Sequence, residues 1–164
     1  MIEAIIAMII LSFVLSILVS YFLGGLNTAI IVTKIKSGED IRKLGSGNAG
    51  LTNTYRTQGK LAALFVLIGD ILKGVFAVLA TRLIFAYVGG INALDVSTGF
   101  YFVGYMSTLC ATLGHVFPPL YGFKGGKGVL VTAGAMLAAE PLLSLILITV
   151  FIVLTLTTKY VSIA

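Results

Sequence analysis

Charged residues are scarce in this sequence, in which only 10% of 164 residues are charged and 59% are hydrophobic. A soluble domain carries about 25% charged and about 45–50% apolar residues. The mean hydropathy, +1.10, is correspondingly high. The composition excludes an ordinary soluble domain and predicts an all-α integral membrane protein, in which residues 1–164 form one membrane-embedded helical bundle.

Cysteine and histidine are nearly absent. Cys110 is the single cysteine and lies in an apolar run, which excludes an intrachain disulfide and a cysteine metal site. His115 is the single histidine, so no second His or Cys could hold a metal ion with it. We expect no metal and no organic cofactor. A lone histidine is more often a packed residue than a catalyst, and both roles stay open for His115.

Apolar runs predict about five membrane spans. They cover residues 5–32, 61–88, 99–118, 128–139 and 142–157, of which the fourth is short for a full crossing. Gly24 and Gly25 lie inside the first run, where they predict close packing against another helix rather than a break. Glu140 and Pro141 mark a turn between the last two runs.

The basic residues predict the orientation. Six of them lie in the loop over residues 34–60: Lys34, Lys36, Arg42, Lys43, Arg56 and Lys60. By the positive-inside rule this loop is cytoplasmic and the N-terminus is outside. The loop over residues 89–98 contains Asp95 and no basic residue, as expected for an outer loop. Arg82 fits this orientation poorly, and we expect its side chain to snorkel to the outer interface.

Asp70 and Lys73 lie inside the second span, three residues apart and therefore on one helical face. Ionisable side chains in a span are costly and usually face the bundle interior or a water-filled cavity. Two roles are open for this pair. It is either a structural ion pair that braces the bundle or part of a polar site.

Two glycine-rich loops contain the candidate site. They are Gly45-Ser-Gly-Asn-Ala-Gly-Leu-Thr-Asn-Thr-Tyr-Arg-Thr-Gln-Gly-Lys60 and Gly122-Phe-Lys-Gly-Gly-Lys-Gly128. Glycine lets a bound oxygen approach backbone N–H groups, and successive N–H groups form a concave anion site. Topology alone would also explain the lysines of the second loop. Because the first loop has a similar composition, phosphate binding is favoured.

Neither loop matches a nucleotide-binding motif. Gly45-x-Gly47-x-x-Gly50 fits the dinucleotide pattern formally, but it follows a membrane helix and a basic loop rather than a buried strand. The Walker pattern fails because Lys127 is followed by Gly128. The net charge of +5 does not indicate a nucleic-acid partner either, because the basic loops lack interleaved aromatic residues.

Three blocks together resemble one family. They are the loop from Gly45 to Lys60, Asp70-x-x-Lys73-Gly74, and Gly114-His115-x-Phe117-Pro118 followed by Phe123-Lys-Gly-Gly-Lys-Gly128-Val129. Their order and spacing are similar to those of the bacterial acyl-phosphate-dependent glycerol-3-phosphate acyltransferases, and the resemblance covers essentially the whole chain. It implies a multi-pass enzyme of the bacterial inner membrane, with its active site facing the cytoplasm. Such an enzyme transfers a fatty acyl group from acyl phosphate to the 1-hydroxyl of glycerol 3-phosphate, giving lysophosphatidic acid for phospholipid synthesis.

The resemblance also suggests roles for individual residues. Four are expected to be catalytic: Ser46, Arg56 and Lys127 on phosphate oxygens, and His115 orienting or polarising a reactant. Asn48, Thr52 and Asn53 would shape the first loop or touch glycerol hydroxyls. Further substrate contacts are expected from the side chains of Lys60, Lys124 and Ser162. The backbone N–H groups of Gly125, Gly126 and Gly128 in the second loop are expected to bind substrate as well. The phosphate of acyl phosphate would itself take the hydroxyl proton.

The family continues with a third cytoplasmic motif, and Tyr160-Val-Ser162-Ile-Ala164 resembles its opening. We therefore expect the chain to lack the last two spans of the family fold. Two other functions stay open on composition: a membrane transporter of phosphate or phosphate esters, and a non-catalytic membrane scaffold. The three blocks favour the acyltransferase, with acyl phosphate, glycerol 3-phosphate and membrane lipids as its partners.

Overall fold

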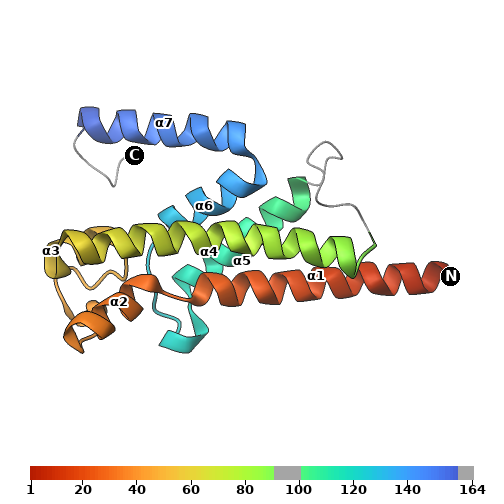
Figure 1. Cartoon of the computed structure of the whole chain (residues 1–164), viewed down its shortest axis with the longest axis horizontal. Helices are drawn as coiled ribbons and strands as arrows, with labels where there is room; N and C mark the ends of the chain where they lie inside the picture. The colour runs from red at the N-terminus through yellow and green to blue at the C-terminus, as the bar shows by residue number, and fades with distance from the viewer. Residues whose placement is uncertain (91–100, 159–164) are drawn as a thin grey trace.

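The computed structural model describes residues 1–90 and 101–158, and this part of the chain contains helices and no strand (Figure 1). The predicted all-α fold is confirmed. The elements in order are α1 (Ile2–Gly25), α2 (Thr28–Ser37), η1 (Ile41–Lys43), α3 (Leu51–Gln58), α4 (Lys60–Tyr87), α5 (Tyr101–Val116), η3 (Pro119–Tyr121), α6 (Val129–Ala139) and α7 (Pro141–Thr158). Asp95 and Ser162 lie outside the described residues.

Within residues 1–90 and 101–158, three stretches are long and apolar enough to cross a membrane: Ile2–Ser37, Lys60–Tyr87 and Pro141–Thr158. The second and third correspond to the predicted spans over residues 61–88 and 142–157. Helices α5 and α6 are shorter, with 16 and 11 residues. The number of membrane crossings and their orientation therefore stay predictions.

The first predicted span is interrupted. Helix α1 ends at Gly25, and Leu26 is extended, with φ −68° and ψ 91°. Asn27 then caps α2, because its side-chain Oδ1 accepts the Ile30 N–H at 3.1 Å. The prediction of one continuous helix over residues 5–32 is wrong. The expectation of close packing at Gly24 is confirmed, since a Cβ there would lie 2.0 Å from the Ala111 carbonyl oxygen.

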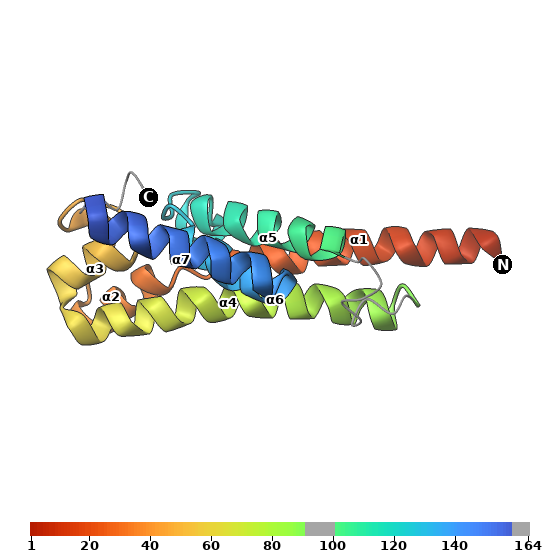
Figure 2. The same ribbon diagram turned by 90° about the horizontal axis from the view of Figure 1, so that it is seen from above.

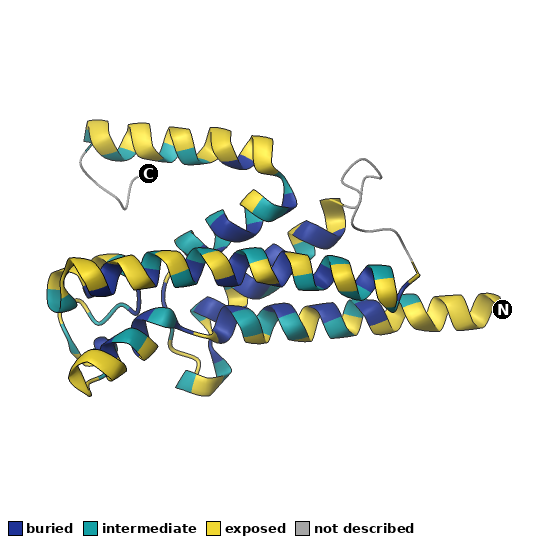
Figure 3. Cartoon of the chain, viewed as in Figure 1, coloured by how far each residue is buried: buried dark blue, intermediate teal, exposed yellow. Residues whose placement is uncertain are grey.

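Small residues pack α1 against its neighbours. Every fourth residue from position 12 to 24 is small and buried: Ser12, Ser16, Ser20 and Gly24. The Ser20 hydroxyl makes hydrogen bonds with Thr81 of α4 at 3.0 Å and with Ser107 of α5 at 2.8 Å. Figure 3 shows the buried residues where these helices face one another. In a membrane, helices associate through close contacts and interhelical hydrogen bonds of this kind, because the hydrophobic effect does not drive their association.

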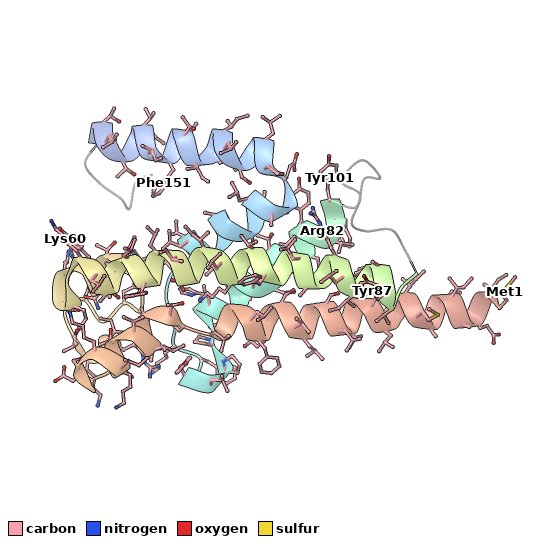
Figure 4. The ribbon with its side chains drawn as sticks, in the orientation of Figure 1. Met1, Lys60, Arg82, Tyr87, Tyr101 and Phe151 are labelled. Carbon is pink, nitrogen blue, oxygen red and sulfur yellow. The ribbon has the colours of Figure 1, made fainter. Side chains whose placement is uncertain are left out.

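Helix α6 packs against α4 through glycines. A Cβ at Gly74 would lie 2.3 Å from the Val131 carbonyl oxygen, and one at Gly134 would lie 2.2 Å from the Ile71 carbonyl oxygen. Arg82 of α4, labelled in Figure 4, donates from Nη2 to the last carbonyl of α6, that of Ala139, at 3.1 Å. Its predicted snorkelling to the outer interface stays a prediction, and within the described residues the side chain satisfies the C-terminal carbonyl of α6.

The polar loops gather at one end of the bundle, and the N-terminus lies at the other. Helices α2 and α3 lie at the left of Figures 1 and 2, and α1 extends to the right. Helix α7 lies apart from α1, and Ser144 is its one buried residue. The remainder of α7 is largely exposed (Figure 3). This arrangement separates a polar end, built from loops, from long apolar helical surfaces.

Candidate functional site

Two loops meet at the polar end. Because residues 51–58 form helix α3, we restrict the name first loop from here on to residues 38–50, between α2 and α3, and call residues 117–128, between α5 and α6, the glycine loop. Arg42 joins them, because its Nη1 donates to the carbonyl of Tyr121 at 2.6 Å and to that of Lys124 at 3.1 Å. Sequence analysis did not single out Arg42 for this role, since its partners lie about 80 residues along the chain and no local pattern marks them.

Asp40 holds Arg42 in that position. Its carboxylate accepts hydrogen bonds from Nε of Arg42 at 3.0 Å and from Nη2 at 2.7 Å. It also accepts a hydrogen bond from the backbone N–H of Arg42. These hydrogen bonds from the Arg42 guanidinium hold the pKa of Asp40 below its ordinary value. The same pairing raises the pKa of Arg42. A bidentate guanidinium–carboxylate pair fixes geometry as well as charge, so the link between the two loops is directional.

Asn53 at the start of α3 organises the first loop. It is 1% exposed, and its Nδ2 lies within hydrogen-bond distance of the carbonyls of Leu44 at 2.9 Å and Asn48 at 3.1 Å. Its Oδ1 accepts the backbone N–H of Ser46 at 3.0 Å. Both ends of the amide are used inside the protein. Of the two roles expected for Asn53, the structure therefore gives it the shaping of the loop.

Around this scaffold the predicted ligands are open to solvent. Six of their side chains are exposed or half-buried and make no hydrogen bond within residues 1–90 and 101–158: Ser46, Asn48, Thr52, Arg56, Lys124 and Lys127. Lys60, which is also exposed, marks the polar end of α4 in Figure 4. Unpaired cations and hydroxyls at one end of the molecule are suited to an anionic ligand from water.

A buried polar cluster lies beneath the loops. Lys73 Nζ is 2.9 Å from Asp70 Oδ1, 2.8 Å from the Leu26 carbonyl oxygen and 2.8 Å from His115 Nδ1. Asp70, Lys73 and His115 are all buried. The prediction that Asp70 and Lys73 share a helical face is confirmed. The pair also connects the break after α1 with the end of α5, a connection that sequence spacing alone does not reveal.

The glycine loop packs against the end of α5. The N–H of Gly125 donates to the Val116 carbonyl at 3.0 Å, and that of Gly126 donates to the His115 carbonyl at 3.2 Å. The expectation that these two N–H groups face a bound anion is therefore wrong, because α5 already uses them. Their glycines instead allow close approach. A Cβ at Gly126 would lie 2.4 Å from both the Ala49 carbonyl oxygen and His115 Nε2.

The free N–H groups lie further along, at the start of α6. Gly128 is the N-cap residue with φ +79°, and no side chain caps this helix. In the described part of the chain, the backbone N–H groups of Lys127 and Gly128 have no hydrogen-bond partner. The first turn of any helix adds further unpaired N–H groups and a partial positive charge. This helix start can hold an anion, and Lys127 directly precedes it.

Within the described ranges, no group of three or more His, Cys, Asp or Glu side chains could hold a metal ion. An open cavity of about 570 Å³ lies between the end of α2 and the first loop. Its lining consists of residues from α2 to the first loop: Lys34, Gly38, Glu39, Asp40, Lys43 and Leu44. None of these is a predicted site residue, so the cavity is separate from the junction at Ala49, His115 and Gly126.

Comparison with known proteins identifies the relatives of this chain. The family model described as glycerol-3-phosphate acyltransferase matches residues 14–164. A glycerol-3-phosphate acyltransferase of Clostridioides difficile is 44% identical over 153 residues, which are 93% of this chain and 71% of that protein. One from Coxiella burnetii is 40% identical over 154 residues, covering 94% of this chain and 73% of that protein.

Two solved structures have a similar fold. Both are crystal structures of PlsY (YgiH), an integral membrane glycerol 3-phosphate acyltransferase. The glycerol 3-phosphate form is 32% identical with a TM-score of 0.75, covering 93% of this chain and 70% of that one. The lysophosphatidic acid form is 29% identical with a TM-score of 0.72, covering 93% of this chain and 69% of that one.

Proposed function

Because the chain belongs to the glycerol-3-phosphate acyltransferase family, we propose that it transfers a fatty acyl group from acyl phosphate to the 1-hydroxyl of glycerol 3-phosphate. The products are lysophosphatidic acid and phosphate. The observation that carries the proposal is the junction of the first loop, the glycine loop and His115, next to the uncapped start of α6. We further propose that residues 1–164 form a single domain in the bacterial inner membrane and that the polar end of this domain faces the cytoplasm. The reaction would supply lysophosphatidic acid for phospholipid synthesis.

The chemistry requires positioning more than a protein nucleophile. The glycerol hydroxyl oxygen attacks the acyl carbonyl carbon, the bond from that carbon to the phosphate oxygen breaks, and phosphate leaves. Acyl phosphate is a mixed anhydride with a good leaving group, and the departing phosphate takes the hydroxyl proton. Holding both reactants in line contributes up to about 7–11 kcal/mol in favourable cases. Positively charged groups close to the developing negative charge stabilise the transition state further.

The phosphate groups bind to the free donors of the polar end. Lys127 and the N–H groups of Lys127 and Gly128 hold one phosphate at the start of α6. Arg56, which is exposed and unpaired, is suited to a bidentate clamp on phosphate oxygens, and Ser46 of the first loop offers a hydroxyl. Lys60 and Lys124 add positive charge, and Asn48 and Thr52 offer polar groups to the glycerol.

The acyl tail stays with the membrane. Long apolar residues are exposed along α1, α4 and α5, including Phe22, Leu72 and Leu109. Lipid covers such surfaces in an integral membrane protein, so a fatty chain can lie beside them while its phosphate head reaches the polar end. Glycerol 3-phosphate is fully polar and arrives from water. The site is therefore at the one end of the bundle where both reactants are accessible.

The test is acyl transfer by the purified protein in lipid. Palmitoyl phosphate and radiolabelled glycerol 3-phosphate are the substrates, and palmitoyl coenzyme A replaces the donor in a matched reaction. Lysophosphatidic acid from the acyl phosphate alone supports the proposal. Product from the coenzyme A thioester alone would overturn the choice of donor. Uptake of labelled glycerol 3-phosphate into sealed vesicles with no acylated product would favour transport instead.

A further inference from the structure

The buried lysine beside the site is held as a cation. Lys73 Nζ forms an ion pair with Asp70 Oδ1 at 2.9 Å and hydrogen bonds with the Leu26 carbonyl and His115 Nδ1, each at 2.8 Å. An ammonium group has three N–H donors and no acceptor. Two neighbours of Lys73, the Asp70 carboxylate and the Leu26 carbonyl, can only accept. Because a neutral amine here would leave the buried Asp70 carboxylate without its countercharge, the protonated lysine is the stable form.

The tautomer of His115 follows from this contact. Since Lys73 can only donate, Nδ1 of the imidazole accepts and carries no proton. The neutral ring then carries its proton on Nε2. A proton on both nitrogens would place two cations 2.8 Å apart in a buried position, and Asp70 Oδ1, at 3.9 Å from Nδ1, is too far away to accept a hydrogen bond from the ring.

The Nε2–H group points at the junction of the loops. A Cβ at Gly126 would lie 2.4 Å from Nε2 and 2.4 Å from the Ala49 carbonyl oxygen, so the two loops and the imidazole meet this closely only because residue 126 is glycine. His115 is 2% exposed, and its Nε2 has no hydrogen-bond partner in the described residues. An unpartnered N–H donor that faces a candidate substrate site is well placed to donate a hydrogen bond to a substrate oxygen.

We propose that Lys73 is a positioning residue for acyl transfer: it fixes His115 as the Nε2–H tautomer and aims that donor at a reactant oxygen between the first loop and the glycine loop. The inference rests on the proposed function. His115 acts as a neutral hydrogen-bond donor that stabilises negative charge as it develops on the acyl carbonyl or the leaving phosphate. It neither gives up nor takes up the reaction proton.

The charged groups around the ring come from two elements. Asp70 and Lys73 of α4 face Nδ1, and the end of α1 contributes only the Leu26 carbonyl. On the glycine loop, Lys124 and Lys127 flank Gly125 and Gly126 and are exposed to solvent. Lys73 is therefore the only cation in direct contact with the ring among the described residues, and its removal should change the protonation of His115.

Nitrogen NMR of the imidazole tests the tautomer directly, because the chain contains a single histidine. In the wild-type protein without substrate, we expect Nε2 to carry the proton and Nδ1 to carry none, with no change between about pH 5 and about pH 8. In Lys73→Met, we expect a mixture of tautomers and titration within that range. A wild-type ring protonated on Nδ1 would overturn the proposal, and this readout needs neither activity nor a folded variant.

Kinetic measurements test how the tautomer of His115 affects acyl transfer. Without Lys73, nothing holds Nδ1 as an acceptor, so a neutral ring can carry its proton on Nδ1 and leave Nε2 without one, whereas the protonated ring keeps an Nε2–H. We therefore expect kcat/KM of Lys73→Met, relative to wild type at the same pH, to fall about tenfold between about pH 6 and about pH 8. A constant ratio would mean that Lys73 is only structural. Comparison with wild type cancels the ionisation of the substrate phosphates.

Variants of His115 complete the test. The amide of His115→Gln can place an N–H near the position of Nε2, whereas His115→Leu cannot. We expect His115→Gln to retain clearly more activity than His115→Leu, which should lose on the order of 100-fold in kcat. Equal losses in both would contradict a donor role. If the NMR result holds but no acyl transfer is found for wild type, the proposed function falls and the tautomer assignment stands.

Discussion

Gly126 and His115 are in contact across the glycine loop, since a Cβ at position 126 would lie 2.4 Å from Nε2 of the imidazole. The same Cβ would lie 2.4 Å from the Ala49 carbonyl oxygen of the first loop. We expect Gly126→Ala to push the two loops apart and to lower acyl-transfer activity by about 100-fold, as a displacement of about 1 Å can do. The measurement is kcat/KM for glycerol 3-phosphate.

Gly122 provides the matched control in the same loop. It has φ +67°, and a Cβ there would meet nothing within 4 Å. Asparagine tolerates this left-handed conformation better than most residues. We therefore expect Gly122→Asn to keep activity near that of wild type. If both variants lose activity equally, the loss at Gly126 does not come from the contact with His115 and Ala49.

Arg42 fixes the distance between the first loop and the glycine loop through the carbonyls of Tyr121 and Lys124. Hydrogen bonds to a charged group are each worth about 1.5–3 kcal/mol. We expect Arg42→Gln to loosen the glycine loop and to raise the KM for glycerol 3-phosphate by roughly tenfold, which corresponds to about 1.4 kcal/mol. A KM equal to that of wild type would show that the link is dispensable.

The contact of α1 with α5 depends on glycine at two positions. A Cβ at Gly24 would lie 2.0 Å from the Ala111 carbonyl oxygen, and one at Gly114 would lie 2.0 Å from the Tyr21 carbonyl oxygen. We expect Gly24→Val to destabilise the protein by about 1–3 kcal/mol, because the two backbones must separate. Thermal unfolding in detergent measures this. Gly24→Ala should be intermediate, and equal stability of all three proteins would contradict the packing.

Asp40 makes the stability of the first loop depend on pH. The pKa of its carboxyl is lowered in the folded protein by hydrogen bonds from Arg42. A lowered pKa contributes stability above the ordinary value of about 3.9, and this contribution is lost as the pH falls below that value. Because the side chain is 26% exposed, solvent limits the effect to roughly 1 kcal/mol or less.

Thermal unfolding of wild type and Asp40→Asn between about pH 3 and about pH 7 tests this pH-dependent contribution of Asp40 to stability. Wild type should be the more stable protein at neutral pH, and the difference should shrink toward the acid end. A difference that stays constant over the whole range would mean that the carboxylate charge does not contribute.

The sequence predicted those parts of the fold that depend on local pattern. The largely apolar run over residues 61–88 agrees with α4, and the short run over residues 128–139 agrees with α6. The break after Gly25 was missed because residues on both sides of it are apolar. Asn27 followed by Thr28 was the signal that could have revealed it, since asparagine is a preferred N-cap residue.

The candidate site was predictable in its residues but not in its contacts. Asp70 and Lys73 are three residues apart, so their shared face follows from helix geometry. The contact of Lys73 with His115 joins residues 42 positions apart, and only the packing of α4 against α5 produces it. In the same way, the use of the Gly125 and Gly126 N–H groups by α5 depends on how the glycine loop folds back.

The most direct test of the account is acyl transfer from palmitoyl phosphate to glycerol 3-phosphate by wild type, Lys127→Ala and Lys34→Ala side by side. Lys127 directly precedes the uncapped start of α6, whereas Lys34 of α2 is an exposed lysine outside the junction. We expect wild type and Lys34→Ala to form lysophosphatidic acid equally, and Lys127→Ala to lose at least about tenfold in kcat/KM. Undiminished product from Lys127→Ala, or none from wild type, would contradict the account.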